Sequence, residues 1–215
     1  MSRSRKADVR ELLLEERLVG YLDPHAERYL LKINGPYLTT TSSCTGRITL
    51  VEGKWHWLRD SARVVFKTHG KISICQLAEV LARPYEDLWL KVTGPIIHAR
   101  VRGLDKALKL LSIARDAGFK HSGIMYIESD ETLMVELISA VQVSEPLKAN
   151  GKWLVEPSSL KDLADLSNRA LEEGWRRLAR LSELIESIQP SPGSSYKLEA
   201  GATPRSQQGT GPCPS

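Results

Sequence analysis

The segment of residues 41–48, TSSCTGRI, combines side chains that could bind an anion or a cofactor. Its hydroxyl-bearing residues are small and its glycine lacks a Cβ, so backbone N–H groups would stay accessible to a ligand. Its arginine can donate two parallel hydrogen bonds to a phosphate or a carboxylate. We therefore predict a ligand-binding loop ahead of a strand, although a turn with locally satisfied hydroxyls would fit too. The loop residues are Ser42, Ser43, Cys44, Thr45, Gly46 and Arg47.

Composition sets only wide limits on the ligand. The chain has 215 residues, a net charge of +4 and a pI near 9.0, which permits an anionic partner without demanding one. Cys44, Cys75 and Cys213 form no CxxC pair and no metal-like cluster with the histidines, so we expect no metal and a reducing compartment. No apolar run reaches the ~18–20 residues of a membrane span. The basic N-terminus lacks the apolar core of a signal peptide, so we expect a cytoplasmic protein.

Apolar periodicity and end signals predict five helices. Asp23 followed by Pro24 is typical of a helix start, and Gly118 of a helix end. Ser73 and Gln76 have the spacing of a capping box. The last helix has an apolar stripe that would lie on a sheet. The predicted helices cover residues 7–19, 23–34, 73–81, 104–117 and 158–188.

Short runs rich in β-branched and aromatic residues predict strands between these helices. They cover residues 47–51, 55–58, 63–67, 88–92, 96–102, 123–128, 133–138, 141–143 and 153–155. Thr93 and Gly94 would turn one hairpin, and residues 129–131 a second. This order indicates an α+β fold with a mixed, largely antiparallel sheet and flanking helices.

We expect a single domain over residues 1–189 and a disordered tail over residues 190–215. Pro, Gly, Ser and Thr supply 16 of the 26 tail residues, so the tail cannot offset its ordering entropy. Residues 45–52 and 122–128 both read hydroxyl, glycine, then a strand that ends in Glu. This echo leaves open a duplicated half with two glycine-led strands at a shared cleft, although hydroxyl-glycine before a strand is also common.

Several motifs together resemble one family of tRNA-modifying enzymes. SSCTGRI at residues 42–48 resembles the Ser-Ser-Cys-small-Gly-Arg-Ile signature of the wybutosine-synthesis N4-methyltransferase family of archaea and eukaryotes. Further matches follow in the family's order, and the resemblance covers about residues 7–185. These matches are Thr68-His69, Ile96-Ile97-His98, AGFKHSGI at 117–124, Pro146-Leu147 and GKWLV at 151–155.

The resemblance implies an S-adenosylmethionine-dependent tRNA methyltransferase. Family members methylate a ring nitrogen of a tricyclic guanosine derivative, the wybutosine precursor, immediately 3′ of the anticodon in phenylalanine tRNA. They do not use the doubly wound methyltransferase fold, and this chain accordingly has no GxGxxG between a strand and a helix. The chain departs from the family at Thr93-Gly94, where members tend to carry Glu-Pro, and over residues 138–147. These departures leave open an altered substrate.

The resemblance also implies roles for individual residues. Methyl transfer needs close, collinear placement of the reactants and no covalent nucleophile, so Cys44 is expected to form a polarisable wall; an activated thiolate is the alternative. A ring nitrogen that is methylated can need its proton removed, so His69 and His98 are candidate general bases, or else structural histidines. The residues expected to bind the cofactor are Ser42, Ser43, Cys44, Thr45, Gly46, Arg47, Ser122 and Gly123.

Aromatic and basic residues are candidates for binding the tRNA. Trp55 and Trp57 alternate in a predicted strand, so their indoles could stack on a flipped base, or simply pack on the sheet. Arg100, with Lys91, Lys106 and Lys109, could contact phosphates or form a solvated face. A non-catalytic RNA-binding protein that holds phosphate in the 41–48 loop is the alternative function. The oligomeric state is left open.

Overall fold

The structure is a computed structural model that describes residues 9–23, 25–58, 60–129 and 131–189. The predicted tail over residues 190–215, with Cys213, lies outside these residues. The first elements are α1 (Val9–Leu18), α2 (Glu27–Ile33), β1 (Leu38–Cys44), β2 (Arg47–Glu52) and β3 (Arg63–Thr68). Then follow α3 (Ile74–Leu81), β4 (Leu88–Thr93), β5 (Ile96–Arg102), α4 (Leu104–Asp116) and β6 (Gly123–Ser129). The last elements are β7 (Thr132–Ile138), β8 (Gln142–Ala149), β9 (Lys152–Trp153), a 3-10 turn (Pro157–Ser159) and α5 (Leu160–Ile188).

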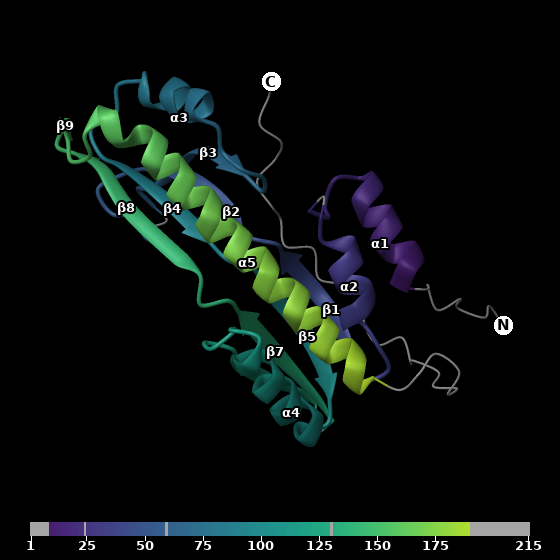
Figure 1. The fold of residues 1–215 in the computed structure, drawn as a ribbon. Helices are drawn as coiled ribbons and strands as arrows, with labels where there is room; N and C mark the ends of the chain where they lie inside the picture. The colour runs from purple at the N-terminus through teal and green to yellow at the C-terminus, as the bar shows by residue number, and fades with distance from the viewer. Residues whose placement is uncertain (1–8, 24, 59, 130, 190–215) are drawn as a thin grey trace.

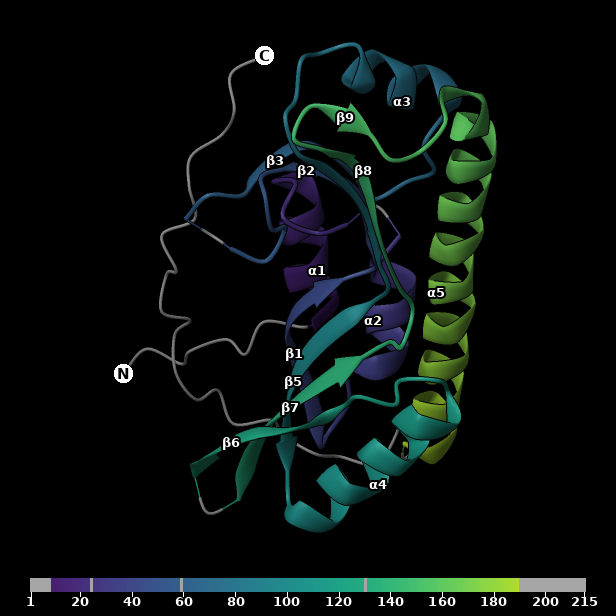
Figure 2. The same ribbon diagram turned by 90° about the vertical axis from the view of Figure 1, so that its left-hand side faces the viewer.

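The strands form two antiparallel sheets, which confirms the predicted α+β class (Figure 1). Sheet A has the order β1-β5-β7-β6, and sheet B has the order β3-β2-β4-β8-β9. Helices α3, α4 and α5 lie on the same side of the sheets, as Figure 2 shows. No helix in the described ranges is long and apolar enough to cross a membrane. The cytoplasmic location and the single domain stay predictions.

Helix α5 packs against both sheets, as its apolar stripe predicted. Leu163 and Leu171 belong to the core beneath sheet B, and Leu178 and Leu181 belong to the core beneath sheet A. Between these groups α5 passes close to the segment that links β4 to β5. A Cβ on Gly174 would lie 2.9 Å from Cδ of Pro95 in that segment. The helix therefore needs a glycine at the point where it crosses from one sheet to the other.

Three predicted elements near the site are wrong. The 41–48 segment is mostly strand, because residues 38–44 pair along β5 and only Thr45 and Gly46 remain as the connection. Residues 55–58 form turns instead of a strand. Strands β4 and β5 are no hairpin, because each belongs to a different sheet. Pro95 has no N–H for a ladder and Gly94 N donates to Val141 O, so the chain crosses between the sheets there.

Other predictions at element ends are confirmed. Ser73 and Gln76 form both hydrogen bonds of the capping box at the start of α3. Gly118 follows α4 with a φ of +89°. The two glycine-led strands of the sequence echo belong to different sheets: β2 is an inner strand of sheet B and β6 is an edge strand of sheet A.

Replacing Gly174 by Ala should destabilise the fold. The added Cβ meets the rigid ring of Pro95, and overpacking of this kind costs about 1–3 kcal/mol, more than the helix propensity of Ala returns. Denaturant unfolding of Gly174→Ala should show this loss. Gly123→Ala is the control, because its added Cβ meets no atom within 4 Å. An unchanged denaturation midpoint for Gly174→Ala would show that α5 does not pack tightly against Pro95 in the segment between β4 and β5.

Candidate functional site

The connection between β1 and β2 is the centre of the site. Gly46 has a φ of +102°, and a Cβ there would lie 2.9 Å from Thr93 O, so this turn requires glycine. Thr45 is buried, and its N and Oγ1 donate to Asp23 Oδ2 over 2.7 and 3.1 Å. The turn that joins the sheets is therefore tied to the segment between α1 and α2.

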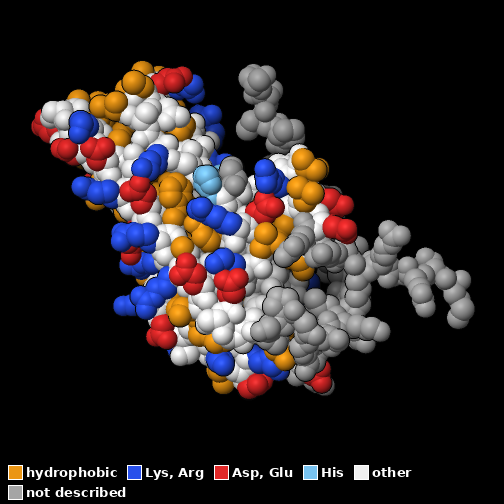
Figure 3. All heavy atoms as spheres, turned by 45° about the vertical axis from the view of Figure 1, so that its right-hand side comes forward, with side chains coloured by type: hydrophobic (Ala, Val, Ile, Leu, Met, Phe, Trp, Pro, Cys, Tyr) orange, Lys and Arg blue, Asp and Glu red, His pale blue; other side chains and the backbone are white. Residues whose placement is uncertain are grey.

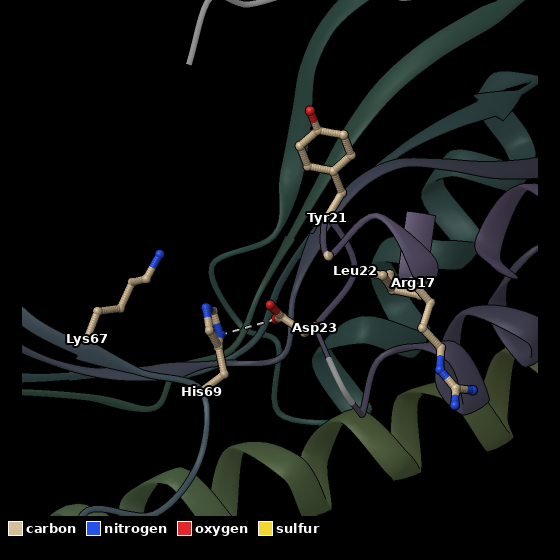
Figure 4. Close-up of a pocket in the computed structure, with 7 residues that line it drawn as sticks. Arg17, Tyr21, Leu22, Asp23, Lys67 and His69 are labelled. Carbon is tan, nitrogen blue, oxygen red and sulfur yellow. Dashed lines mark ion pairs between the residues drawn. The ribbon is translucent and has the colours of Figure 1, made fainter. Parts of the chain in front are cut away.

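Asp23 also pairs with His69 (Figure 4). The prediction that Asp23 opens the second helix is wrong, since α2 begins at Glu27 without a side-chain cap. His69 Nδ1 lies 3.2 Å from Asp23 Oδ2 and 3.1 Å from Gly46 O. Both oxygens can only accept, so Nδ1 carries a hydrogen. Cys44 Sγ lies 3.9 Å from the same nitrogen.

This arrangement holds a proton on His69. The hydrogen bond to Asp23, followed by the contact with Cys44, raises the pKa of His69 to about 10 against the opposing effect of burial. Burial acts to raise the pKa of Asp23, but the hydrogen bonds from His69 and Thr45 outweigh it and leave that pKa below its usual value. At neutral pH the pair is an imidazolium and a carboxylate.

A cavity of about 670 Å³ opens beside this ion pair (Figure 4). Its size is in the range of pockets that bind small molecules. Lys67 and His69 bring positive charge to it, and Tyr21 adds an aromatic ring that is 87% exposed. The lining residues are Arg17, Gly20, Tyr21, Leu22, Asp23, Lys67 and His69. A second cavity, of about 250 Å³, borders Tyr21, Leu22 and the strand residues from Thr39 to Ser43.

Asp23, Cys44 and His69 also present three ligand atoms within 4.8 Å of one another, a cluster that the sequence did not suggest. Asp23 Oδ2 already accepts from Thr45 N, Thr45 Oγ1 and His69 Nδ1. A metal ion would have to displace these donors and the proton on His69. We therefore interpret the cluster as a hydrogen-bonded ion pair.

A second group of polar side chains crosses the solvent face of sheet A. The strand register places Ser42 beside His98 and His98 beside Glu136. Ser42 Oγ lies 2.8 Å from His98 Nδ1, and His98 Nε2 lies 2.9 Å from Glu136 Oε1. A carboxylate only accepts, so Nε2 carries a hydrogen, and in the neutral imidazole Nδ1 accepts from Ser42. Glu136 was not predicted, because only the pairing of three strands brings it to His98.

The cluster around His69 and the polar row through His98 lie next to each other, because each includes a residue of β1. Ser42 and Cys44 are two residues apart and point to the same face of the strand, a spacing of about 7 Å. Ser42 contacts His98 and Cys44 contacts His69. The predicted loop residues and both candidate histidines therefore meet, although they do so along a strand end.

Other predicted residues lie apart from this centre. Ser122 Oγ donates to Phe119 O and accepts from Ile138 N, so its hydroxyl serves the turn before β6. Gly123 is three strands from Ser42, about 14 Å away. Arg100 donates from Nε and Nη2 to Glu128 over 2.7 and 2.9 Å, which occupies its fork.

Trp55 and Trp57 lie in the turn after β2, at the far end of that strand from Arg47. Their rings stack with centroids 4.9 Å apart and an angle of 23° between the planes. They lie beside Trp89 of β4 and are 41% and 58% exposed. The two indoles lie side by side, although a turn, not the predicted strand, places them there.

Comparison with known proteins decides the family. Residues 4–187 match the family described as Methyltransferase TYW3. The chain belongs to this family. A protein of Aeropyrum pernix is 48% identical over 181 residues, which are 84% of this chain and 96% of the relative. A protein of Saccharolobus solfataricus is 34% identical over 192 residues, 88% of this chain and 89% of the relative. Both are named tRNA(Phe) 7-((3-amino-3-carboxypropyl)-4-demethylwyosine(37)-N(4))-methyltransferase.

Solved structures show the same fold for this TYW3 family member. A hypothetical protein from Aeropyrum pernix matches with a TM-score of 0.72 and 45% identity, over 77% of this chain and 98% of that one. A protein from Pyrococcus horikoshii matches with a TM-score of 0.73 and 29% identity, over 82% of this chain and 94% of that one. The family resemblance predicted from residues 42–48 and the later motifs is confirmed.

Replacing His69 by Gln should change how stability depends on pH. The pKa of His69 is raised from 6.5 to about 10 by folding, so its ion pair stabilises the fold fully below pH 6.5 and is lost as pH rises through 10. The free energy of unfolding of the unmodified protein should exceed that of His69→Gln by about 2 kcal/mol near pH 6, allowing for partial exposure. The difference should shrink steadily towards pH 10.

Denaturant titrations between pH 5 and pH 10 measure this difference. Asp23→Asn should lose the same pH-dependent contribution, because it removes the partner of the imidazolium. A stability difference that stays constant over this range would contradict the ion pair.

Proposed function

We propose that this protein methylates a ring nitrogen of the wybutosine precursor that lies 3′ of the anticodon in phenylalanine tRNA. Membership of the TYW3 family and the names of relatives that are 48% and 34% identical support this activity. The observation that carries the proposal is the meeting of Ser42, Cys44, Asp23 and His69 beside a cavity. These side chains come from three separate segments and converge where the family signature ends.

We propose that the methyl donor is S-adenosylmethionine, bound in the 670 Å³ cavity. Bound there, S-adenosylmethionine would supply a methyl carbon made electrophilic by its sulfonium. The residues fit such a molecule, because Lys67 and the imidazolium of His69 would bind its carboxylate and the exposed ring of Tyr21 offers a face for its adenine. Arg47 is exposed at the start of β2, directly after the Thr45-Gly46 turn, and would bind a phosphate of the tRNA.

The two histidines would have different tasks. His69 already carries its proton at neutral pH, so it serves as a fixed positive charge and not as a general base. His98 has an accepting Nδ1 that faces Ser42, and Glu136 holds the hydrogen on its other nitrogen. In the transfer, the target nitrogen would take the methyl carbon as its bond to the donor's sulfur breaks, which leaves a neutral thioether. The nitrogen would lose a proton, which His98 would accept directly or through Ser42. Glu136 then faces the imidazolium that forms.

Cys44 would shape the site without a covalent bond. Its Sγ lies 3.9 Å from His69 Nδ1, beside the site. Methyl transfer from a sulfonium needs close, collinear placement of the two reactants and no covalent nucleophile. This requirement supports the role of a polarisable wall.

A transfer assay tests the function directly. The full chain, S-adenosylmethionine and phenylalanine tRNA that carries the demethylated precursor should yield a nucleoside one methyl group heavier by mass spectrometry. Calorimetry should show binding of the methyl donor in the same preparation. Binding of tRNA without donor binding or transfer would contradict the enzyme and leave the non-catalytic RNA-binding function.

Replacing His98 by Ala should slow transfer by about 10²- to 10⁴-fold, the usual effect of removing a general base. The loss should be smallest at high pH, where hydroxide substitutes for the base. Glu136→Gln should lower kcat less than His98→Ala and leave KM unchanged, because Glu136 orients His98 and does not touch the substrate. Melting temperatures check that both variants fold. Full turnover in His98→Ala would remove His98 from the proton transfer.

A further inference from the structure

The outer face of sheet B, turned away from α3 and α5, begins at the candidate site and ends at the tryptophans. Ile48 and Leu50 of β2 point into the core, so Arg47, Thr49 and Val51 point to the opposite face. The register places Thr49 between Lys67 and Lys91, and Val51 beside Trp89. We call this surface, with the turn that carries Trp55 and Trp57, the outer face. Its residues are Arg47, Trp55, Trp57, Lys67, Trp89 and Lys91, whereas Thr49 and Val51 on the same side of β2 are buried, at 7% and 6% exposure.

The aromatic end of the outer face is built from four rings. Trp55 and Trp57 stack on each other, and His56 meets Trp89 with centroids 4.9 Å apart. Trp89 Nε1 donates to Gly53 O, which fixes the ring beneath the turn. Burial, followed by the charge of Lys91, lowers the pKa of His56, so its ring is uncharged at neutral pH and belongs to the stack. Two large indoles remain 41% and 58% exposed on a rigid support.

The basic part of the outer face has no acidic partner in the described residues. Neither Arg47, Lys67 nor Lys91 forms an ion pair within that part of the chain. Burial, followed by the charge of Arg47, lowers the pKa of Lys91, so an anion bound between them would relieve a repulsion. By contrast, acidic and basic side chains are interspersed over the face that Figure 3 shows.

The predicted basic face around Arg100 does not form a unit of this kind. Arg100 pairs with Glu128, and Lys106 lies over the ring of Tyr37. Arg100 also belongs to sheet A, whereas Lys91 belongs to sheet B. Lys109 on α4 also forms no ion pair in the described residues, but of this predicted set only Lys91 lies on the outer face.

We propose that the outer face is a stacking platform for unpaired nucleotides of the tRNA anticodon loop, with Trp57 and Trp55 under bases and Lys91 and Arg47 on the backbone. The proposal rests on the tRNA methyltransferase function above. Indoles stack on any base, and neighbouring cations follow the phosphates, which is how single strands are bound. Lys67 borders both the outer face and the donor cavity, so a loop that lies on this face would end at the reacting centre.

The dimensions agree with a short single strand. From Arg47 to Val51 the strand rises about 13 Å, and the indoles extend the surface beyond its end. A double helix could not place its stacked bases against the indoles. The platform would therefore distinguish the loop of the anticodon arm from its stem.

Binding of an anticodon stem-loop RNA of phenylalanine tRNA to the full chain tests the platform. Trp57→Ala should weaken binding by about tenfold or more, the effect of losing one stacked base, whereas Trp57→Phe keeps an aromatic face and most of the affinity. Lys91→Gln should reduce the slope of log affinity against log salt by about 0.7, the value for one phosphate contact to a single strand. A duplex of the stem alone, without the loop, should bind both tryptophan variants equally.

Matched controls separate the platform from general effects. Trp153→Ala removes an indole of similar exposure, 40%, that lies under Lys148 on the edge strand β9. Lys161→Ala removes an exposed lysine that pairs with Asp165 on α5. Both controls should bind the stem-loop like the unmodified protein. Calorimetric binding of S-adenosylmethionine should be the same in Trp57→Ala, because Trp57 does not line the cavity.

The outcomes distinguish this proposal from the proposed function. Unchanged stem-loop affinity in Trp57→Ala and Lys91→Gln, in a protein that still methylates tRNA, would overturn the platform and leave the enzyme. No stem-loop binding and no transfer by the unmodified protein would overturn both. Sedimentation that shows a dimer, broken by Trp57→Ala with RNA affinity retained, would assign the outer face to a second copy of the chain and overturn the platform.

Discussion

The ion pair between Asp23 and His69 is the interaction on which the rest of the site depends. It joins the segment after α1, the turn between β1 and β2 and the end of β3, which are far apart in the sequence. A partly buried carboxylate is costly unless its oxygens are satisfied, and here Thr45 and His69 supply three hydrogen bonds to one oxygen. The same contacts fix the turn that connects the two sheets. The cavity lies between two of these segments, because its lining residues come from the end of α1 with the residues that follow it and from the end of β3.

Some charged side chains near the Asp23–His69 ion pair have a partner of opposite charge and others have none, and this difference separates their proposed roles. Asp23 holds His69 positive, whereas Glu136 orients His98 through Nε2, so the two histidines would have different roles in the proposed reaction. Arg100 is neutralised by Glu128, whereas Arg47 and Lys91 repel each other on the outer face of sheet B. In the proposed function, an anionic substrate would meet Arg47 and Lys91 on one side of the site. The indoles lie further along the same surface.

The sequence predicted which residues belong to the site better than it predicted the elements and contacts that bring them together. Local signals were sufficient for the capping box at Ser73 and for α5, because periodicity and caps act within a few residues. The strand character of residues 38–44 was missed, since their polar composition suggests a loop and only pairing with β5 overrides it. Asp23 and Glu136 were missed as site residues for the same reason. Their partners are 22 to 46 residues and 38 residues away, and no local pattern reports such contacts.

The central claim is that His69 is a cation fixed by Asp23, and a histidine titration followed by NMR tests it most directly. The account predicts that the His69 imidazole stays protonated through neutral pH and titrates near pH 10. In Asp23→Asn, which removes the partner charge, the same resonance should titrate at lower pH. A His69 resonance that titrates near pH 6.5 in both proteins would contradict the account, because the ion pair would then not hold the proton.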